Sequence, residues 1–153
     1  MDFTFDDETV GIRRLLWRWT QEWKSDLDDL AVLCHGIREF YNKEQKDRFV
    51  RLICEELLAK ENLPVMRKAE LQVYLAGIAF EDLENQWEEC KIHFMEAEHH
   101  LVDQEAWVEA HGECNGMVTA IRKILDGMRG DMLEHESKVG VRILFSVPMK
   151  APH

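Results

Sequence analysis

Leu71-Gln-Val-Tyr-Leu-Ala-Gly-Ile-Ala-Phe80 is the stretch of sequence that decides the fold. Wound into a helix, it is apolar on nearly every side, and such a helix is usually enclosed by others rather than exposed along one face. It lies within a helical pattern that extends from about Met66 to Leu83. We therefore expect this helix at the centre of a helical bundle.

The rest of the chain is also helical in pattern. The three prolines are Pro64, Pro148 and Pro152, and between them apolar residues recur every three or four positions almost throughout. This spacing predicts five further helices, over about 9–24, 26–41, 43–61, 86–100 and 103–130. The predicted fold class is all-α, a bundle of about six helices.

The pattern changes after Gly140. Val141-Arg-Ile-Leu-Phe-Ser-Val147 is rich in β-branched residues and bounded by glycine and proline, so it predicts a short extended C-terminal segment. Such a segment needs a partner, which is a groove of the bundle, a second copy or another chain. At 153 residues the chain is expected to form a single helical domain over 1–153, with the bundle in 1–139 and an extended tail or strand in 140–153.

The negative charge is concentrated in one block. Residues 69–113 hold twelve acids and one base, Lys91, so the block carries −11, which equals the net charge of the whole chain. A local field of one sign indicates a partner of the opposite sign. The candidate partner-binding residues lie around the end of the central helix and along the next one: Glu81, Asp82, Glu84, Glu88, Glu89 and Glu96.

These observations predict a non-enzymatic protein-binding module. We expect an acidic inhibitor or adaptor that docks a Glu-rich face on a basic surface of a partner protein. The partner class includes nucleic-acid-binding enzymes, because carboxylates can stand in for phosphates, as in inhibitors of the phage or viral type. Direct binding of nucleic acid is not expected, since it requires clustered Lys and Arg. The oligomeric state is left open.

Common catalytic motifs are absent. The sequence contains no GxxxxGK[ST] or GxGxxG loop and no GxSxG turn, so no enzyme activity and no cofactor are expected. The N-terminus lacks a signal-peptide pattern, and no apolar run approaches the ~18 residues of a membrane span. The four cysteines are scattered within apolar helical patterns, which favours reduced core thiols and a cytoplasmic protein without membrane contact.

One metal arrangement remains as an alternative. Cys90-x-x-His93 and His111-x-x-Cys114 are symmetric about position 102. If the helices on either side form a hairpin that turns near Val102, two thiolates and two imidazoles face one another and can hold zinc tetrahedrally. This alternative predicts a zinc-stabilised domain or small metalloenzyme. The competing interpretation is that both cysteines fill the apolar seam of the hairpin.

Part of the chain resembles a single tetratricopeptide repeat. In the segment 87–97, Trp87, Cys90, Phe94 and Ala97 match the aromatic and small positions of the second helix of such a repeat. Leu75-Ala76 with Ala79-Phe80 is similar to the first helix, although the turn is about two residues longer and the closing proline is missing. The resemblance covers 69–101 and implies a helical hairpin in a scaffold or chaperone that binds a peptide in a groove between helices.

Overall fold

The computed structural model of the chain describes residues 7–44, 48–112 and 116–139. These residues form six helices and no strand: α1 (Asp7–Glu22), α2 (Leu27–Glu44), α3 (Arg48–Leu58), α4 (Val65–Phe80), α5 (Leu83–His111) and α6 (Gly116–Val139). The predicted all-α class is therefore confirmed. The predicted extended segment 141–147 lies outside the described residues.

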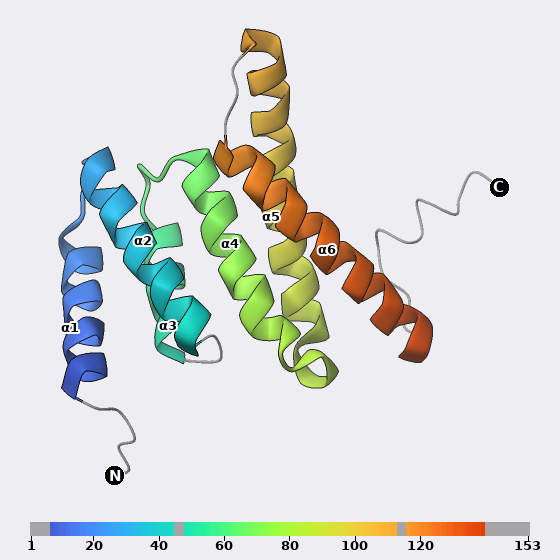
Figure 1. Cartoon of the computed structure of the whole chain (residues 1–153), viewed down its shortest axis with the longest axis horizontal. Helices are drawn as coiled ribbons and strands as arrows, with labels where there is room; N and C mark the ends of the chain where they lie inside the picture. Colours follow the sequence, from blue (N-terminus) through green and yellow to red (C-terminus); the bar gives the residue numbers. More distant parts are fainter. Residues whose placement is uncertain (1–6, 45–47, 113–115, 140–153) are drawn as a thin grey trace.

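The helices are arranged as successive antiparallel pairs (Figure 1). α1, α2, α4 and α6 follow one another across the view, α3 and α5 lie behind them, and α6 crosses in front of α5. α4 contacts α3, α5 and α6, and its contact with α5 is the most extensive between any two helices of the described chain. The prediction that the 71–80 stretch occupies the centre is confirmed.

Two apolar clusters meet on α4 and explain why this helix is apolar all round. Leu71, Leu75 and Ile78 belong to a cluster shared with α1, α2 and α3. On the other side, Ala69, Val73, Ala76 and Ala79 belong to a cluster shared with α5 and α6. The second side is lined mainly by alanines, whose small side chains let α5 pack close to the α4 backbone. α4 is thus the common wall of both halves of the core.

The predicted boundary between two helices at residues 100–103 is wrong. After a kink at Gln86, α5 continues through residues 100–103 to His111. No glycine or proline interrupts the helix there, and Leu101 continues its buried stripe. The helix ends at Gly112, whose φ of 67° is a left-handed conformation that glycine adopts without steric cost. A kink at Gln86 (φ −122°, ψ 29°) marks where the sequence pattern placed the start of the helix.

α6 begins at Gly116 rather than near Asp103, and it runs to Val139 despite two internal glycines. Its buried stripe is Val118, Ile121, Leu125 and Met132, which packs on α4 and α5. None of the helices in the described part of the chain is both long and apolar enough to cross a membrane.

Candidate functional site

A groove of about 530 Å³ lies between α2, α4 and α6, and we call it the α2–α4–α6 groove. Its size is within the usual range for ligand-binding clefts. α2 contributes Arg38, Tyr41 and Asn42, α4 contributes Glu70, Val73 and Tyr74, and α6 contributes Met117, Ala120, Ile121, Ile124 and Met128.

The α6 wall of the groove is apolar and partly open to solvent. Ile124 is 49% exposed, while Met117 and Met128 are half-buried. Methionine side chains are flexible and polarisable, and they are common on surfaces that adapt to different apolar ligands. Val73 of α4, which is buried, also lines the groove. The wall can therefore accept apolar side chains from another molecule.

The opposite wall carries a charged network centred on Glu70, which is only 5% exposed. Glu70 Oε2 accepts hydrogen bonds from Arg38 Nη2 at 2.9 Å and from Tyr74 Oη at 2.6 Å, and Oε1 accepts one from Arg67 Nη1 at 2.8 Å. Arg38 Nε also donates to Tyr74 Oη at 3.2 Å. The pKa of Tyr74 is raised, mainly by burial and to a smaller extent by the negative charge of Glu70 and by the hydrogen bond that Tyr74 donates to it. Glu70 thus belongs to a satisfied internal network rather than to an acidic surface.

Tyr41 of α2 also lines the groove. Its ring lies beside that of Tyr74, with 4.9 Å between ring centroids. A β-carbon built on Gly77 would lie 1.9 Å from the Tyr41 hydroxyl, so the absence of a side chain at Gly77 makes room for this ring. Burial and then the charge of Glu81 raise the pKa of Tyr41.

The predicted acidic residues do not form one uniform face. Glu88 pairs with Lys91 at 3.1 Å, and Glu89 pairs with Arg51 of α3 at 3.1 Å. Glu96 lies 4.0 Å from His100. Arg51 lies outside the block, so its pair with Glu89 offsets part of the charge that the sequence assigned to it. Lys91 was already counted in that charge, and burial lowers the pKa of His100.

Two acids further along α5 are also paired across the bundle. Glu105 accepts two hydrogen bonds from Arg122, at 2.8 and 2.9 Å, and this contact lowers the pKa of Glu105. Glu98 pairs with Arg122 and with Arg129. Both arginines come from α6, outside the acidic block, which is why counting charge along the sequence overstated the local field.

Three of the predicted acids remain together at the α4–α5 turn. Glu81 and Glu84 are exposed, and Asp82 contacts Asn85 at 3.2 Å. Glu84 makes no ion pair within the described residues, and segment 79–87 contains no Lys or Arg. We call Glu81, Asp82 and Glu84 the turn cluster. Within this cluster, Glu84 is the acid whose charge is not offset by an ion pair among the described residues.

The hairpin required by the zinc alternative is absent, because α5 is a continuous helix through Val102. Cys90 and His111 are 21 residues apart on it, or about 30 Å along its axis. Cys90 is buried, while exposed His111 stacks on Trp107. His93 Nδ1 contacts Gln72 Oε1 at 2.7 Å. Cys114 lies outside the described residues, and no group of three metal-ligating side chains occurs within them.

Three described cysteines are buried free thiols: Cys34, Cys54 and Cys90. Burial raises the pKa of Cys34 and of Cys90 to about 12, and it also raises that of Cys54. Such thiols are protonated at neutral pH and are poor nucleophiles. The prediction of reduced core thiols is confirmed for these three residues.

The sequence analysis missed the groove because its residues come from three helices that are distant along the chain. The available signal was a second apolar line on α6, Met117, Ile124 and Met128, which lies off the buried stripe. An apolar line beside the buried stripe of a helix indicates that the apolar face of that helix is wider than packing in the core requires.

The helical hairpin implied by the tetratricopeptide resemblance is present as α4 and α5. No protein-family model, curated protein or solved structure matches this chain. Membership of a family is thus not shown, and the function has to be argued from the groove itself.

Proposed function

We propose that this protein is a non-enzymatic binding module that holds an apolar segment of a partner protein in the α2–α4–α6 groove. The observation that carries the proposal is the pairing of an open apolar wall on α6 with a rigid polar wall on α2 and α4. Apolar side chains of the segment would contact Ile124 and Met128. The guanidinium of Arg38, whose side chain is 41% exposed, has N–H donors left for a carbonyl or carboxylate of the segment.

The turn cluster favours a partner with basic residues beside that apolar segment. The turn cluster follows α4, which lines the groove, and its exposed Glu81 and Glu84 would attract a Lys or Arg that flanks the bound segment. The proposal therefore keeps the expected basic partner surface but assigns most of the binding free energy to the groove. A nucleic-acid-binding enzyme is one partner of this kind, with the protein acting as inhibitor or adaptor.

Site-specific photocrosslinking tests the groove. A benzoylphenylalanine at Ala120, which is exposed and lines the groove, is compared with one at Lys123, which is exposed on the same helix but does not line it. The proposal expects a crosslinked peptide from Ala120 only, containing an apolar stretch next to Lys or Arg. Adding Ile124→Glu should abolish the crosslink because it buries a charge in the apolar contact. Equal crosslinking from both positions would contradict the proposal.

A second candidate is docking through the turn cluster alone, as the acidic inhibitor first expected. The observation that favours it is that segment 79–87 contains three acids, of which Glu81 and Glu84 are exposed, and no Lys or Arg. The two candidates separate in a binding assay at 50 and 500 mM salt. The groove proposal expects Ile124→Glu to abolish binding at both salt concentrations, whereas Glu81→Gln with Glu84→Gln weakens it mainly at low salt. Unchanged binding by Ile124→Glu together with loss in the Gln variant would favour the acidic candidate.

A cytoplasmic location is part of the proposal. It is supported by the three buried free thiols, since reduced cysteines are characteristic of reducing compartments. Fractionation of the native cells, with detection of the untagged protein, is the direct test.

A further inference from the structure

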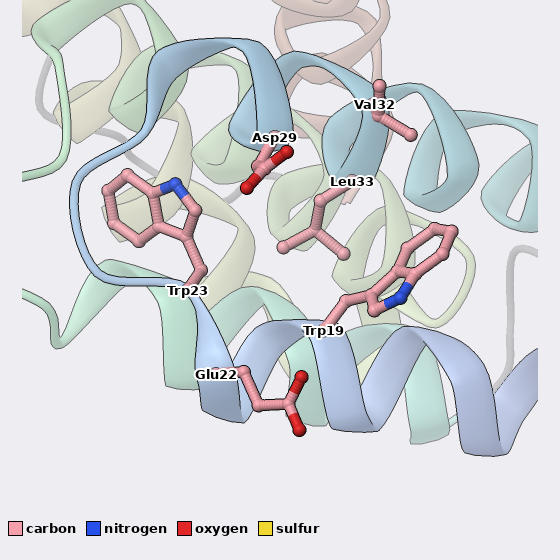
Figure 2. Close-up of a pocket in the computed structure, with 6 residues that line it drawn as sticks. All are labelled: Trp19, Glu22, Trp23, Asp29, Val32 and Leu33. Atoms are coloured by element: carbon pink, nitrogen blue, oxygen red, sulfur yellow. The ribbon is translucent and has the colours of Figure 1, made fainter.

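A second, smaller cavity of about 340 Å³ lies where α1 meets the beginning of α2. Its lining is Trp19, Glu22, Trp23, Asp29, Val32 and Leu33. Figure 2 shows Trp19 of α1 and Trp23, the residue that follows α1, on either side of the Leu33 side chain, with the carboxylate of Asp29 above it and that of Glu22 below it. We call this cavity the tryptophan pocket. It is separate from the α2–α4–α6 groove and shares no lining residue with it.

The apolar part of the pocket is held in place by the core. Leu33 is 1% exposed and Trp23 is 5% exposed. Trp23 Nε1 donates a hydrogen bond to the backbone oxygen of Asp26 at 2.6 Å, which fixes the orientation of its indole. Trp19 lies one helical turn before Trp23, is only half-buried and lines the cavity. The pocket therefore places the half-buried Trp19 ring beside a wall fixed by the buried Trp23 and Leu33 side chains.

The polar part of the pocket consists of carboxylates without an internal counter-ion. Glu22 and Asp29 are exposed and make no ion pair within the described residues. The surrounding segment 22–29 contains four acids and one base, Lys24, which gives it a local charge of −3. Lys24 and Arg18, the nearest bases in sequence, are exposed and do not line the pocket. The pocket thus combines aromatic faces with uncompensated negative charge.

We propose that the tryptophan pocket binds an alkylated ammonium group. A cation over an indole face is attracted by the ring, and tryptophan is the strongest of the aromatic side chains in this respect. Alkyl groups on the nitrogen suit the apolar walls formed by Leu33 and Val32, whereas an unalkylated ammonium is compact and strongly hydrated. The carboxylates of Glu22 and Asp29 supply the opposite charge. The ligand is either a methylated lysine side chain of a protein or a free quaternary amine such as choline.

Titration followed by NMR tests the chemistry directly. Tetramethylammonium and choline are added to the ¹⁵N-labelled full chain, and the indole N–H signal of Trp19 is followed. Trp107, which is 44% exposed near the end of α5, serves as an internal control. The proposal expects saturable shifts at Trp19 and none at Trp107. The neutral isostere 3,3-dimethylbutan-1-ol should bind about tenfold more weakly than choline, because it lacks the charge. Equal affinity for the neutral isostere would overturn the proposal.

Charge variants separate the pocket from the general acidity of the protein. Glu22→Gln with Asp29→Asn removes two charges at the pocket and should weaken choline binding by about tenfold or more. Asp28→Asn with Glu61→Gln removes two exposed charges that do not line the pocket and should leave binding within a factor of two. Asp28 and Asp29 both lie in the first turn of α2, so the two pairs are also matched in their effect on that helix. Equal weakening by both pairs would contradict a specific site.

A trimethyllysine peptide and its unmethylated counterpart identify the source of the ammonium group. Tighter binding of the trimethyllysine peptide than of choline assigns the pocket to a protein ligand, and the reverse assigns it to a small quaternary amine. Failure of both to shift the Trp19 signal would overturn the proposal. Because the pocket and the groove share no residue, Ile124→Glu should leave choline binding unchanged, which keeps this test independent of the proposed function.

Discussion

Replacing Glu70 by Gln tests whether the charged network of the groove exists in solution. The change keeps the shape of the side chain but removes its charge and one of its two acceptor oxygens. At present Glu70 accepts hydrogen bonds from Arg38, Arg67 and Tyr74 at 2.6 to 2.9 Å. In the glutamine variant, the amide oxygen can still accept hydrogen bonds from Tyr74 and Arg38. The amide NH₂ group would then face Arg67, and two donors cannot form a hydrogen bond with each other.

The expected cost follows from the bond that is lost. A hydrogen bond to a charged group contributes about 1.5 to 3 kcal/mol to stability. The Arg67 side chain is 17% exposed, so water can replace only part of the lost contact. The more exposed Arg38 rehydrates more easily, which keeps the cost below that of breaking a fully buried ion pair. We expect Glu70→Gln to lower the free energy of unfolding by about 2 kcal/mol.

Urea denaturation followed by far-UV circular dichroism measures this change, with the m-value as a check that the unfolding transition is unaltered. Tyr74→Phe removes the hydroxyl from the same network, so the two changes should be coupled by about 1 kcal/mol in a double-mutant cycle. Glu61→Gln, an exposed change of the same type, should cost less than about 0.5 kcal/mol. A cost for Glu70→Gln no larger than that of Glu61→Gln, or additive effects with Tyr74→Phe, would refute the network.

Three further predictions concern the fold. Gly77→Ala should destabilise by about 1 to 3 kcal/mol because its β-carbon meets the Tyr41 hydroxyl, and Tyr41→Phe should recover part of that loss in urea denaturation. Gly112→Ala should cost about 1 kcal/mol through its positive φ, and a near-zero cost would contradict the α5 C-cap. Folding raises the pKa of Cys34 and of Cys90 from 9.0 to about 12, so the free energy of unfolding should be constant below pH 9 and should fall between pH 9 and 12. Each cysteine contributes up to about 1.4 kcal/mol per pH unit to this fall. Cys34→Ala should therefore reduce the slope of stability against pH in this range.

The fold class and the central helix were predictable because both depend on local periodicity. An apolar helix without a polar face has to be enclosed, and Leu71 and Ala76 on opposite sides of α4 are both fully buried. The position of the α5–α6 break was not predictable in the same way. Leu101 and its neighbours are compatible with both a turn and a continuous helix, and the outcome depends on how far α5 can pack along α4 and α6.

The candidate sites depended still more on tertiary structure. Glu70 and Glu84 belong to the same acidic block in the sequence, yet one is buried beside Arg38 and Arg67 and the other is exposed at a turn. The arginines that offset Glu98 and Glu105 come from α6. No count along the chain shows these pairs, because electrostatic interactions depend on distance in space and on burial.

The sequence by itself determined that this chain forms helices, which of them lies at the centre, and that its acids are concentrated between residues 69 and 113. These properties follow from residue type and from spacing along a single helix. Only the tertiary structure decided which acids remain uncompensated, and it alone brought Arg38, Val73 and Ile124 together around one groove and Trp19 and Asp29 around one pocket. The physical reason is that a site is made by side chains from different helices, and the packing of those helices sets the distances between them.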